Sequence, residues 1–239
     1  MQLASYYWIN ARTKHIDNIL KEEAVKGIKQ VVILGAGYDS RAYRFRDILP
    51  EVRFFEVDLP ATLAQKKNLV ANIMGSLADW VVYVSIDFNR QSLEGVLKKA
   101  GYEPTQKTFF IWEGVTQYIT EQGVDNTLRF IADHSAPGSS VIFDYVLQPV
   151  IEGTSGDYKC REVAAIVASK GEPWIFGIGE GEAEHFVNQR GLVVLSELRP
   201  AELTQQYLVR GDGSIDGRMP GCVRILHASV PSSTSKENR

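Results

Sequence analysis

Short apolar runs alternate along the chain with longer stretches in which apolar residues recur at helical spacing. The first run, QVVIL at residues 30–34, has no alternation of polar and apolar positions, which is typical of a strand covered on both faces. Further runs predict strands at 52–57, 81–86, 108–112 and 139–145. Helices are predicted before and between them, at 4–25, 40–49, 60–74, 91–100 and 120–134. This order favours right-handed crossovers and a mostly parallel α/β sheet.

The regular alternation ends after the fifth strand. Residues 148–181 contain no clear strand, hold the glycine-rich pieces GTSGDY and FGIGEG, and include a predicted helix at 158–170. We interpret this segment as an acceptor-selecting insertion or lid over the carboxyl edge of the sheet, within a single domain at residues 1–230. A helix at 182–190 and two last strands at 192–198 and 222–230, joined by 199–221, suit an antiparallel end to the sheet. The polar residues 231–239 predict a disordered tail.

Composition narrows the choice of environment and partner. The net charge of −3 over 239 residues argues against a nucleic-acid partner, and no apolar run reaches the length that a membrane span needs. The first residues, MQLASYYWINARTKH, lack the apolar core and cleavage site of a secretory signal, so we expect a cytoplasmic location. Cys160 and Cys222 form neither a CxxC pair nor a metal-binding spacing, and we expect two free thiols and no metal site.

A bare turn follows the first strand, in VVILGAGYDSRAYRF. In an open parallel sheet, ligands bind beyond the carboxyl ends of the strands, and glycines such as Gly35 and Gly37 let a ligand lie against the backbone. A dinucleotide fingerprint would have a third glycine where this chain has Ser40. It would also rarely carry an acid such as Asp39, which suits a cationic ligand better than a pyrophosphate.

An acidic string, FFEVD, ends the second predicted strand about 20 residues further on. A carboxylate at such a strand end can accept hydrogen bonds from both hydroxyls of a ribose. Glu56 and Asp58 are two residues apart and point to the same side of an extended strand, so either can perform this role. Together with the glycine turn, they indicate an adenosine-bearing cofactor without choosing among such cofactors.

Four strings in order, LGAGYDSRAYRF, FFEVDLPATLAQKK, VSIDF and FIWEGVTQYIT, resemble the leucine carboxyl methyltransferase family and its bacterial O-methyltransferase relatives. The resemblance spans about residues 6–145, with a weaker likeness in the last strands. It implies a Rossmann-like class I methyltransferase fold with seven strands and helices on both faces of the sheet. It also implies the cofactor S-adenosyl-L-methionine, with S-adenosyl-L-homocysteine as product. Many relatives carry a longer N-terminal arm that helps to close the site, whereas only a few residues precede the matching helix here.

The resemblance assigns roles to individual cofactor-binding residues. The glycines would pass under the methionine part, Asp58 would hold the ribose, Asp87 and Phe88 would contact adenine, Glu113 would lie near the amino group and Arg12 would reach the carboxylate. Other interpretations stay open for several of them. Asp87 can cap a helix, Glu113 can be idle and Arg12 can lie on a solvated helix face. Asp39 or Ser40 can cap the helix after the glycines, and Arg41 can pair with a local acid.

The implied reaction is an in-line displacement at the methyl carbon, with a small-molecule carboxylate or hydroxyl as acceptor. A carboxylate is already a nucleophile at neutral pH and needs no general base. We expect Tyr118 to orient it, ahead of Tyr7, Tyr145 and Arg161.

The remaining aromatic and basic candidates are less specific. Trp174 and Phe176 can wall an apolar acceptor pocket or simply pack the lid. The four histidines, His15, His134, His185 and His227, are expected at the surface or at helix ends. If the acceptor is a hydroxyl, which needs a base, His185 becomes a candidate for that role.

Two other functions compete with this one, and the sequence leaves the oligomeric state open. A non-catalytic module could bind the cofactor or its demethylated product and regulate a partner. A nicotinamide-dependent oxidoreductase could use a similar sheet, although Asp39 and Ser40 weigh against it.

Overall fold

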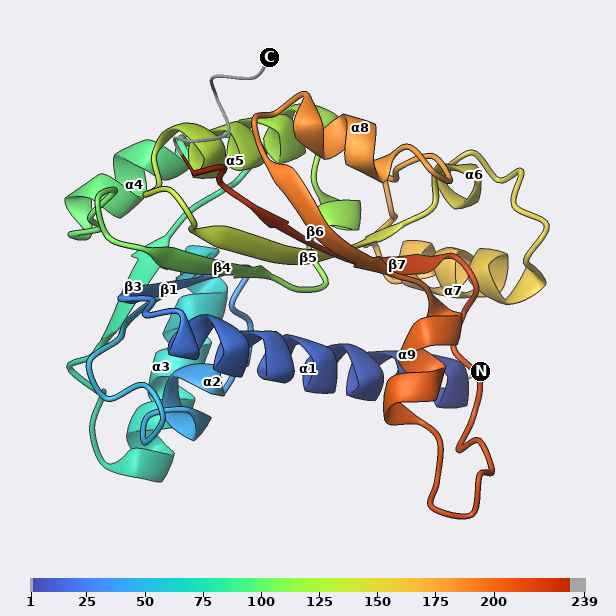
Figure 1. Ribbon diagram of the computed structural model, residues 1–239, viewed down its shortest axis with the longest axis horizontal. Helices are drawn as coiled ribbons and strands as arrows, with labels where there is room; N and C mark the ends of the chain where they lie inside the picture. Colours follow the sequence, from blue (N-terminus) through green and yellow to red (C-terminus); the bar gives the residue numbers. More distant parts are fainter. Residues whose placement is uncertain (1, 233–239) are drawn as a thin grey trace.

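The computed structural model of the protein describes residues 2–232, which form a seven-stranded sheet with helices on both faces (Figure 1). The strand order is β3-β2-β1-β4-β5-β7-β6. The neighbours from β3 to β5 pair in parallel, whereas β7 is antiparallel to both β5 and β6. Both the parallel sheet and its antiparallel end were predicted from the sequence and are confirmed. The strands are β1 (Gln30–Leu34), β2 (Arg53–Asp58), β3 (Val81–Ser85), β4 (Thr108–Trp112), β5 (Ser140–Val146), β6 (Val193–Leu198) and β7 (Val223–Ser229).

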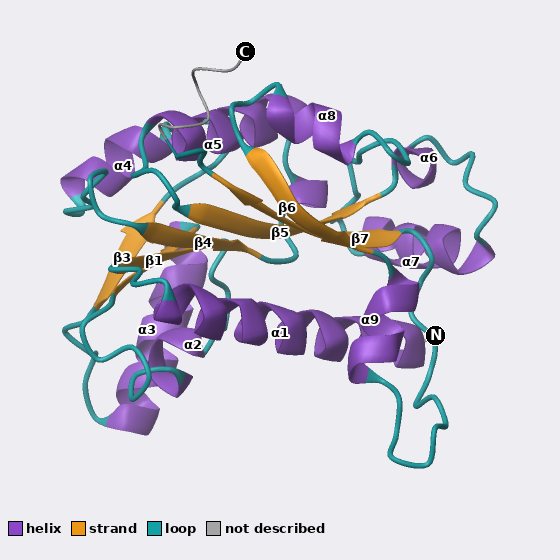
Figure 2. Cartoon of the chain, viewed as in Figure 1, coloured by secondary structure: helices purple, strands orange, loops and turns teal. Residues whose placement is uncertain are grey.

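The helices form a layer on each face of the sheet (Figure 2). One layer contains α1 (Gln2–Val25), α2 (Arg41–Arg44), α3 (Pro60–Met74) and α9 (Pro200–Tyr207). The other contains α4 (Leu93–Lys99), α5 (Glu121–Asp133) and α8 (Ala183–Asn188). After β5 come α6 (Gln148–Ile151) and α7 (Tyr158–Ser169), and the short 3₁₀ helix η1 (Thr116–Tyr118) follows β4.

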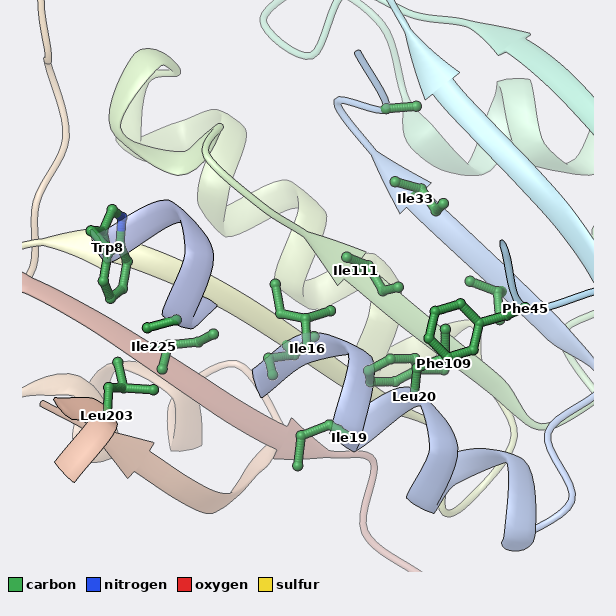
Figure 3. Packing of buried hydrophobic residues seen from close by; sticks show 14 of the residues in the cluster. Trp8, Ile16, Ile19, Leu20, Ile33, Phe45, Phe109, Ile111, Leu203 and Ile225 are labelled. Atoms are coloured by element: carbon green, nitrogen blue, oxygen red, sulfur yellow. The ribbon is translucent and has the colours of Figure 1, made fainter. Parts of the chain in front are cut away.

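Each face of the sheet has its own hydrophobic core. Because side chains alternate along a strand, Phe109 and Ile111 of β4 face α1, while Phe110 and Trp112 belong to the core of the opposite face. On the α1 side, Trp8, Ile16 and Leu20 from the helix and Leu203 from α9 meet strand residues such as Ile225 (Figure 3). Burial of the central strands on both faces leaves the strand ends as the place where a ligand can reach the sheet.

Several helices differ from their predicted ranges. The helix predicted at 40–49 is only four residues long, because after Phe45 the chain continues in tight turns up to Pro50. The helix predicted at 91–100 begins later, at Leu93, where Ser92 is the N-cap and accepts from the backbone N–H of Gly95. α9 was missed inside the predicted connection 199–221, since it is short and buries a single residue, Leu203. The predicted tail at 231–239 lies outside the described residues except for 231 and 232.

The prediction of two free thiols is wrong. The structure joins Cys160 of α7 to Cys222 in a disulfide. The chain after β5 folds back against the start of β7, which brings two residues 62 positions apart to a Cα–Cα distance of 6.1 Å. The side chain of Asp157 accepts a hydrogen bond from the backbone of Gly221 at 3.0 Å beside it. The expectation of free thiols failed because spacing along the sequence says nothing about this return. The cytoplasmic location stays a prediction.

The segment at 148–181, predicted as a lid, is tied to the carboxyl ends of β4 and β5. The backbone N–H of Ile178 donates to Val146 at 3.1 Å, and that of Gln148 donates to Ile178 at 3.0 Å. Ile175 donates to the carbonyl of Gln117 in η1 at 2.8 Å. The segment therefore lies against the loop that follows β4, and its role as a lid stays a prediction. Within residues 2–232, no helix is long and apolar enough to cross a membrane.

Candidate active site

A cavity of 350 Å³ opens beside the carboxyl end of β1. It is lined by the glycine turn, the first residues of α2, one face of α1 and the end of β4. Of the predicted cofactor-binding residues, this cavity brings together Arg12, Gly35, Gly37 and Glu113. Its further lining residues are Thr13, Ile33, Ala36, Tyr38, Asp39, Ser40, Arg41 and Arg44. Residues far apart in the sequence thus meet at the edge where a parallel sheet binds ligands.

The two glycines of the turn lack a side chain for different reasons. Gly35 has φ +68°, and a Cβ atom there would lie 2.2 Å from the Cγ2 atom of Val115, so a neighbouring side chain already fills this space. Gly37 has φ +42°, and nothing lies closer than 3.9 Å to its missing Cβ. The turn is fastened to β2, because Gly35 and Ala36 both donate to the carbonyl of Val57, at 2.8 and 3.1 Å. Gly37 is therefore the position at which the backbone is open toward a ligand.

The structure separates the two acids at the end of β2. Asp58 is half-buried and accepts from the backbone N–H groups of Gly37 and Leu59, each at 2.6 Å. Glu56 is fully buried and ion-pairs with Lys66 at 2.7 Å. Burial raises the pKa of Glu56 to about 7, although Lys66 opposes the change. Asp58 does not line the cavity, but its bond to Gly37 places it at the glycine turn, whereas Glu56 is buried away from it, which favours Asp58 over Glu56 for the ribose.

Asp87 and Phe88 lie away from the lining of this cavity. Asp87 accepts from the backbone of Asn89 at 3.0 Å and pairs with Arg90 at 3.4 Å, so its carboxylate stabilises a turn. It does not cap α4, whose N-cap is Ser92. Phe88 lines a second cavity, between α4 and α5. Their predicted contact with adenine stays a prediction.

Arginines and carboxylates alternate along one wall of the first cavity. The Nε atom of Arg12 lies 2.9 Å from Glu113 Oε1, and its Nη1 atom lies 2.5 Å from Asp144 Oδ2. The other oxygen of Glu113 receives Arg41 Nη1 at 2.7 Å. Burial alone would raise the pKa of Glu113, but the two arginines outweigh it and lower the pKa, so the group is ionised at neutral pH. Arg12 thus lies in an ion-pair network and not on a solvated helix face, and Glu113 is not idle.

Arg41 anchors the helix that follows the glycine turn. It is buried and pairs with Asp39, with Glu113 and, at 2.7 Å, with Asp17 of α1, which confirms the predicted pairing with a local acid. Asp39 also accepts from the backbone N–H of Arg41 at 2.6 Å, whereas Ser40 makes no capping bond with its side chain. Of the two proposed caps, Asp39 is therefore the one that the structure shows.

Comparison with known proteins now identifies the family. The sequence model described as leucine carboxyl methyltransferase matches residues 2–132, more than half of the chain. The chain belongs to the leucine carboxyl methyltransferase family. This match includes the glycine turn, Asp58 and Glu113.

This member of the leucine carboxyl methyltransferase family is also similar in sequence to proteins from several bacteria. A Bacillus subtilis protein named "Putative S-adenosyl-L-methionine-dependent methyltransferase YktD" is 29% identical over 197 residues, which cover 82% of this chain and 64% of that protein. A protein of the same description from Streptomyces avermitilis is 32% identical over 193 residues, 79% of this chain and 68% of its own length. The chain thus spans about two thirds of the length of these relatives.

Solved structures show the same fold at low sequence identity. A structure described as a putative methyltransferase from Thermobifida fusca has a TM-score of 0.63 at 18% identity and covers 96% of this chain and 83% of its own. The mitomycin 7-O-methyltransferase MmcR has a TM-score of 0.54 at 18% identity, covering 88% and 52%. Likenesses at this identity establish the Rossmann-like class I methyltransferase fold.

The residues predicted to orient the acceptor differ in whether their polar groups already form hydrogen bonds within the chain. Tyr145 is buried and donates to Glu197, and burial raises the pKa of its hydroxyl. Arg161 donates to the carbonyl of Ser155. Tyr118 is half-buried in η1, and within residues 2–232 its hydroxyl forms no hydrogen bond.

Two aromatic candidates of the lid segment and Tyr7 pack against other parts of the chain. Tyr7 is half-buried and packs over Gly217, where a Cβ atom would lie 2.0 Å from its ring. Phe176 belongs to a hydrophobic core and lies 5.8 Å from the ring of Phe186, which fits lid packing, and Trp174 is half-buried.

The histidines are not all where they were expected. His134 caps the end of α5 and His185 is exposed in α8, as predicted. His15 and His227, in contrast, are buried, because α1 packs over β7. Burial lowers the pKa of His227 to about 3 and also lowers that of His15, whose Nδ1 atom lies 3.0 Å from the hydroxyl of Tyr207. None of the four lines the cavity at the glycine turn.

Asp144 and Asp17 belong to this network and were missed from the sequence. Asp144 interrupts the apolar strand β5, SVIFDYV, and Asp17 interrupts the helical pattern of α1. Glu113 was assigned by resemblance to the family, whereas Asp144 carries a signal of its own, because an acid inside an otherwise apolar buried strand is unusual.

Proposed function

We propose that this chain is an S-adenosyl-L-methionine-dependent methyltransferase that methylates an oxygen atom of a small molecule, with a carboxylate as the preferred acceptor. The observation that carries the proposal is the pair of Arg12 and Glu113, which line one cavity with the open backbone of Gly37. Membership of the family and the names of the relatives support the same cofactor.

The charges of the cavity fit the amino-acid end of this cofactor. That end carries an ammonium and a carboxylate, and Glu113 and Arg12 offer one group of opposite charge to each. In the structure the two side chains pair with one another, and each has a second partner, Asp144 for Arg12 and Arg41 for Glu113. A zwitterion that enters between them therefore replaces one ion pair by two and leaves neither buried charge unpaired.

The nucleoside end of the cofactor would extend along the glycine turn. Asp58 accepts one backbone N–H on each oxygen. A carboxylate has about four acceptor sites, so two remain for the hydroxyls of a ribose. Asp87 and Phe88 belong to the proposal as contacts to adenine, on resemblance to the family alone.

When bound, S-adenosyl-L-methionine supplies a methyl group on a sulfonium, which an acceptor oxygen can attack in line. The chain then has to align the acceptor and exclude water. A carboxylate is ionised at neutral pH and needs no base. We assign its orientation to Tyr118, whose hydroxyl is unengaged among the described residues and whose helix is bonded to the segment at 148–181.

Calorimetry followed by a transfer assay tests the proposal. We expect S-adenosyl-L-homocysteine to bind, and label from methyl-labelled cofactor to appear in members of a carboxylic-acid panel. Binding of the product without transfer to any acid or alcohol would favour the regulatory module. Absence of binding would refute the cofactor assignment. Glu113→Gln is the site variant, and Asp125→Asn on α5 is the control, because Asp125 also pairs with arginines, Arg129 and Arg190.

A further inference from the structure

Asp144 holds three structural elements together behind the cavity. It is 3% exposed and lies in β5, two residues before the strand ends at Val146. One of its carboxylate oxygens receives Arg12 of α1 at 2.5 Å, and the other receives the backbone N–H of Gly114 at 2.5 Å. Its backbone carbonyl accepts from the hydroxyl of Thr116 at 2.6 Å. Gly114 and Thr116 in the loop after β4, and Arg12 in α1, are therefore all held by Asp144.

The two acids that hold Arg12 differ in access to the cavity. Glu113 lines it and Asp144 does not. Asp144 is thus the inner partner of the guanidinium and Glu113 the partner that a ligand can reach. If a ligand's ammonium binds Glu113 in place of Arg12, Asp144 remains as the acid of the described chain that holds Arg12.

The loop after β4 adds a geometric constraint. Gly114 has φ +71°, and a Cβ atom there would lie 3.4 Å from Arg12 Nη2. The guanidinium therefore occupies the space beside this glycine, while Asp144 bonds to both. Asp144 and Gly114 therefore restrict the orientation of the Arg12 guanidinium, and Asp144 also balances its charge.

We propose that Asp144 is a positioning residue that aims Arg12 at the carboxylate of an amino-acid-bearing ligand, so that Glu113, which keeps Arg41 on its Oε2 atom, can bind the ligand's ammonium through Oε1. This inference rests on the proposed function, because it assumes that the ligand carries an amino-acid end. Asp144 itself does not touch the ligand.

Two ligands that differ in that end test the inference. S-adenosyl-L-homocysteine carries the amino acid, whereas 5′-methylthioadenosine keeps only the nucleoside and the thioether. We expect Asp144→Asn to weaken binding of the first by about tenfold to a hundredfold, the usual range for a lost charged hydrogen-bond partner, and to change binding of the second by less than about twofold. Asp125→Asn should change neither. Equal weakening of both ligands would mean a merely structural role, and no weakening would also overturn the inference.

A double variant keeps the test decisive if Asp144→Asn does not fold. Arg12→Gln/Asp144→Asn removes both buried charges together, which is better tolerated than leaving one unpaired. If Asp144 acts through Arg12, the double variant binds S-adenosyl-L-homocysteine as Arg12→Gln does. Weaker binding by the double variant than by Arg12→Gln would overturn the inference. If the unmutated protein binds neither ligand, the proposed function itself has failed, which is a distinct result.

Discussion

Gly35 and Gly37 stand two residues apart in one turn, yet a methyl group has different consequences at each. At Gly35 it would collide with Val115 at 2.2 Å, and the φ of +68° adds strain. We predict that Gly35→Ala lowers the free energy of unfolding by about 2–3 kcal/mol, as overpacking does, and that Val115→Ala in the same chain restores part of it. Gly37→Ala should cost about 1 kcal/mol in stability for its positive φ but weaken S-adenosyl-L-homocysteine binding. Urea denaturation and calorimetry measure the two effects. Equal losses of stability in both variants would contradict this division.

The buried Glu56 makes stability depend on pH. Burial raises its pKa from 4.5 to about 7, so between these values the folded chain binds a proton that the unfolded chain has released. The stabilising contribution is complete below pH 4.5 and is lost as the pH rises through about 7. The difference corresponds to about 3 kcal/mol.

Comparison with a variant isolates this contribution from other titrating groups. We predict that the unfolding free energy of the unmutated protein, minus that of Glu56→Gln, falls between pH 4.5 and 8. Urea denaturation at several pH values measures it. A difference that rises with pH would mean that Lys66, 2.7 Å away, keeps the carboxylate ionised throughout.

At the scale of elements, the sequence predicts helices and strands that carry a local pattern. It misses elements whose formation depends on contacts with distant segments. β1, β4 and α3 have the predicted bounds, because buried strands and a proline-initiated helix carry local signals. α9 carries no comparable signal, since its role is to place Leu203 against α1.

The site follows the same division. Gly37 and the acidic pair Glu56 and Asp58 were found because they follow or end apolar runs, whereas Glu113 and the choice of Asp58 came from resemblance to the family. The structure, however, supplied the burial of Glu56, the packing of Val115 on Gly35 and the position of Asp144 behind Arg12. These depend on which strands are neighbours, which no single segment of the sequence encodes.

At the scale of the molecule, a disulfide links α7 to the segment just before β7, at the antiparallel end of the sheet. The disulfide between Cys160 and Cys222 encloses α8, β6 and α9, so it closes a long loop of the unfolded chain. Such a constraint stabilises a protein mainly by lowering the entropy of its unfolded state, typically by about 2–4 kcal/mol. We therefore predict that a reductant lowers the free energy of unfolding by this amount.

The matched control is the variant Cys160→Ser/Cys222→Ser, which lacks the bond in either buffer. Urea denaturation with and without dithiothreitol should show that the reduced protein and the variant share one lower stability, and that the reductant leaves the variant unchanged. Thiol titration of the denatured, unreduced protein should find no free thiol. Two thiols per chain in that titration would contradict the disulfide and restore the prediction made from the spacing of the cysteines. A disulfide that persists would instead make the cytoplasmic location the weaker expectation, because reducing compartments keep most such pairs open.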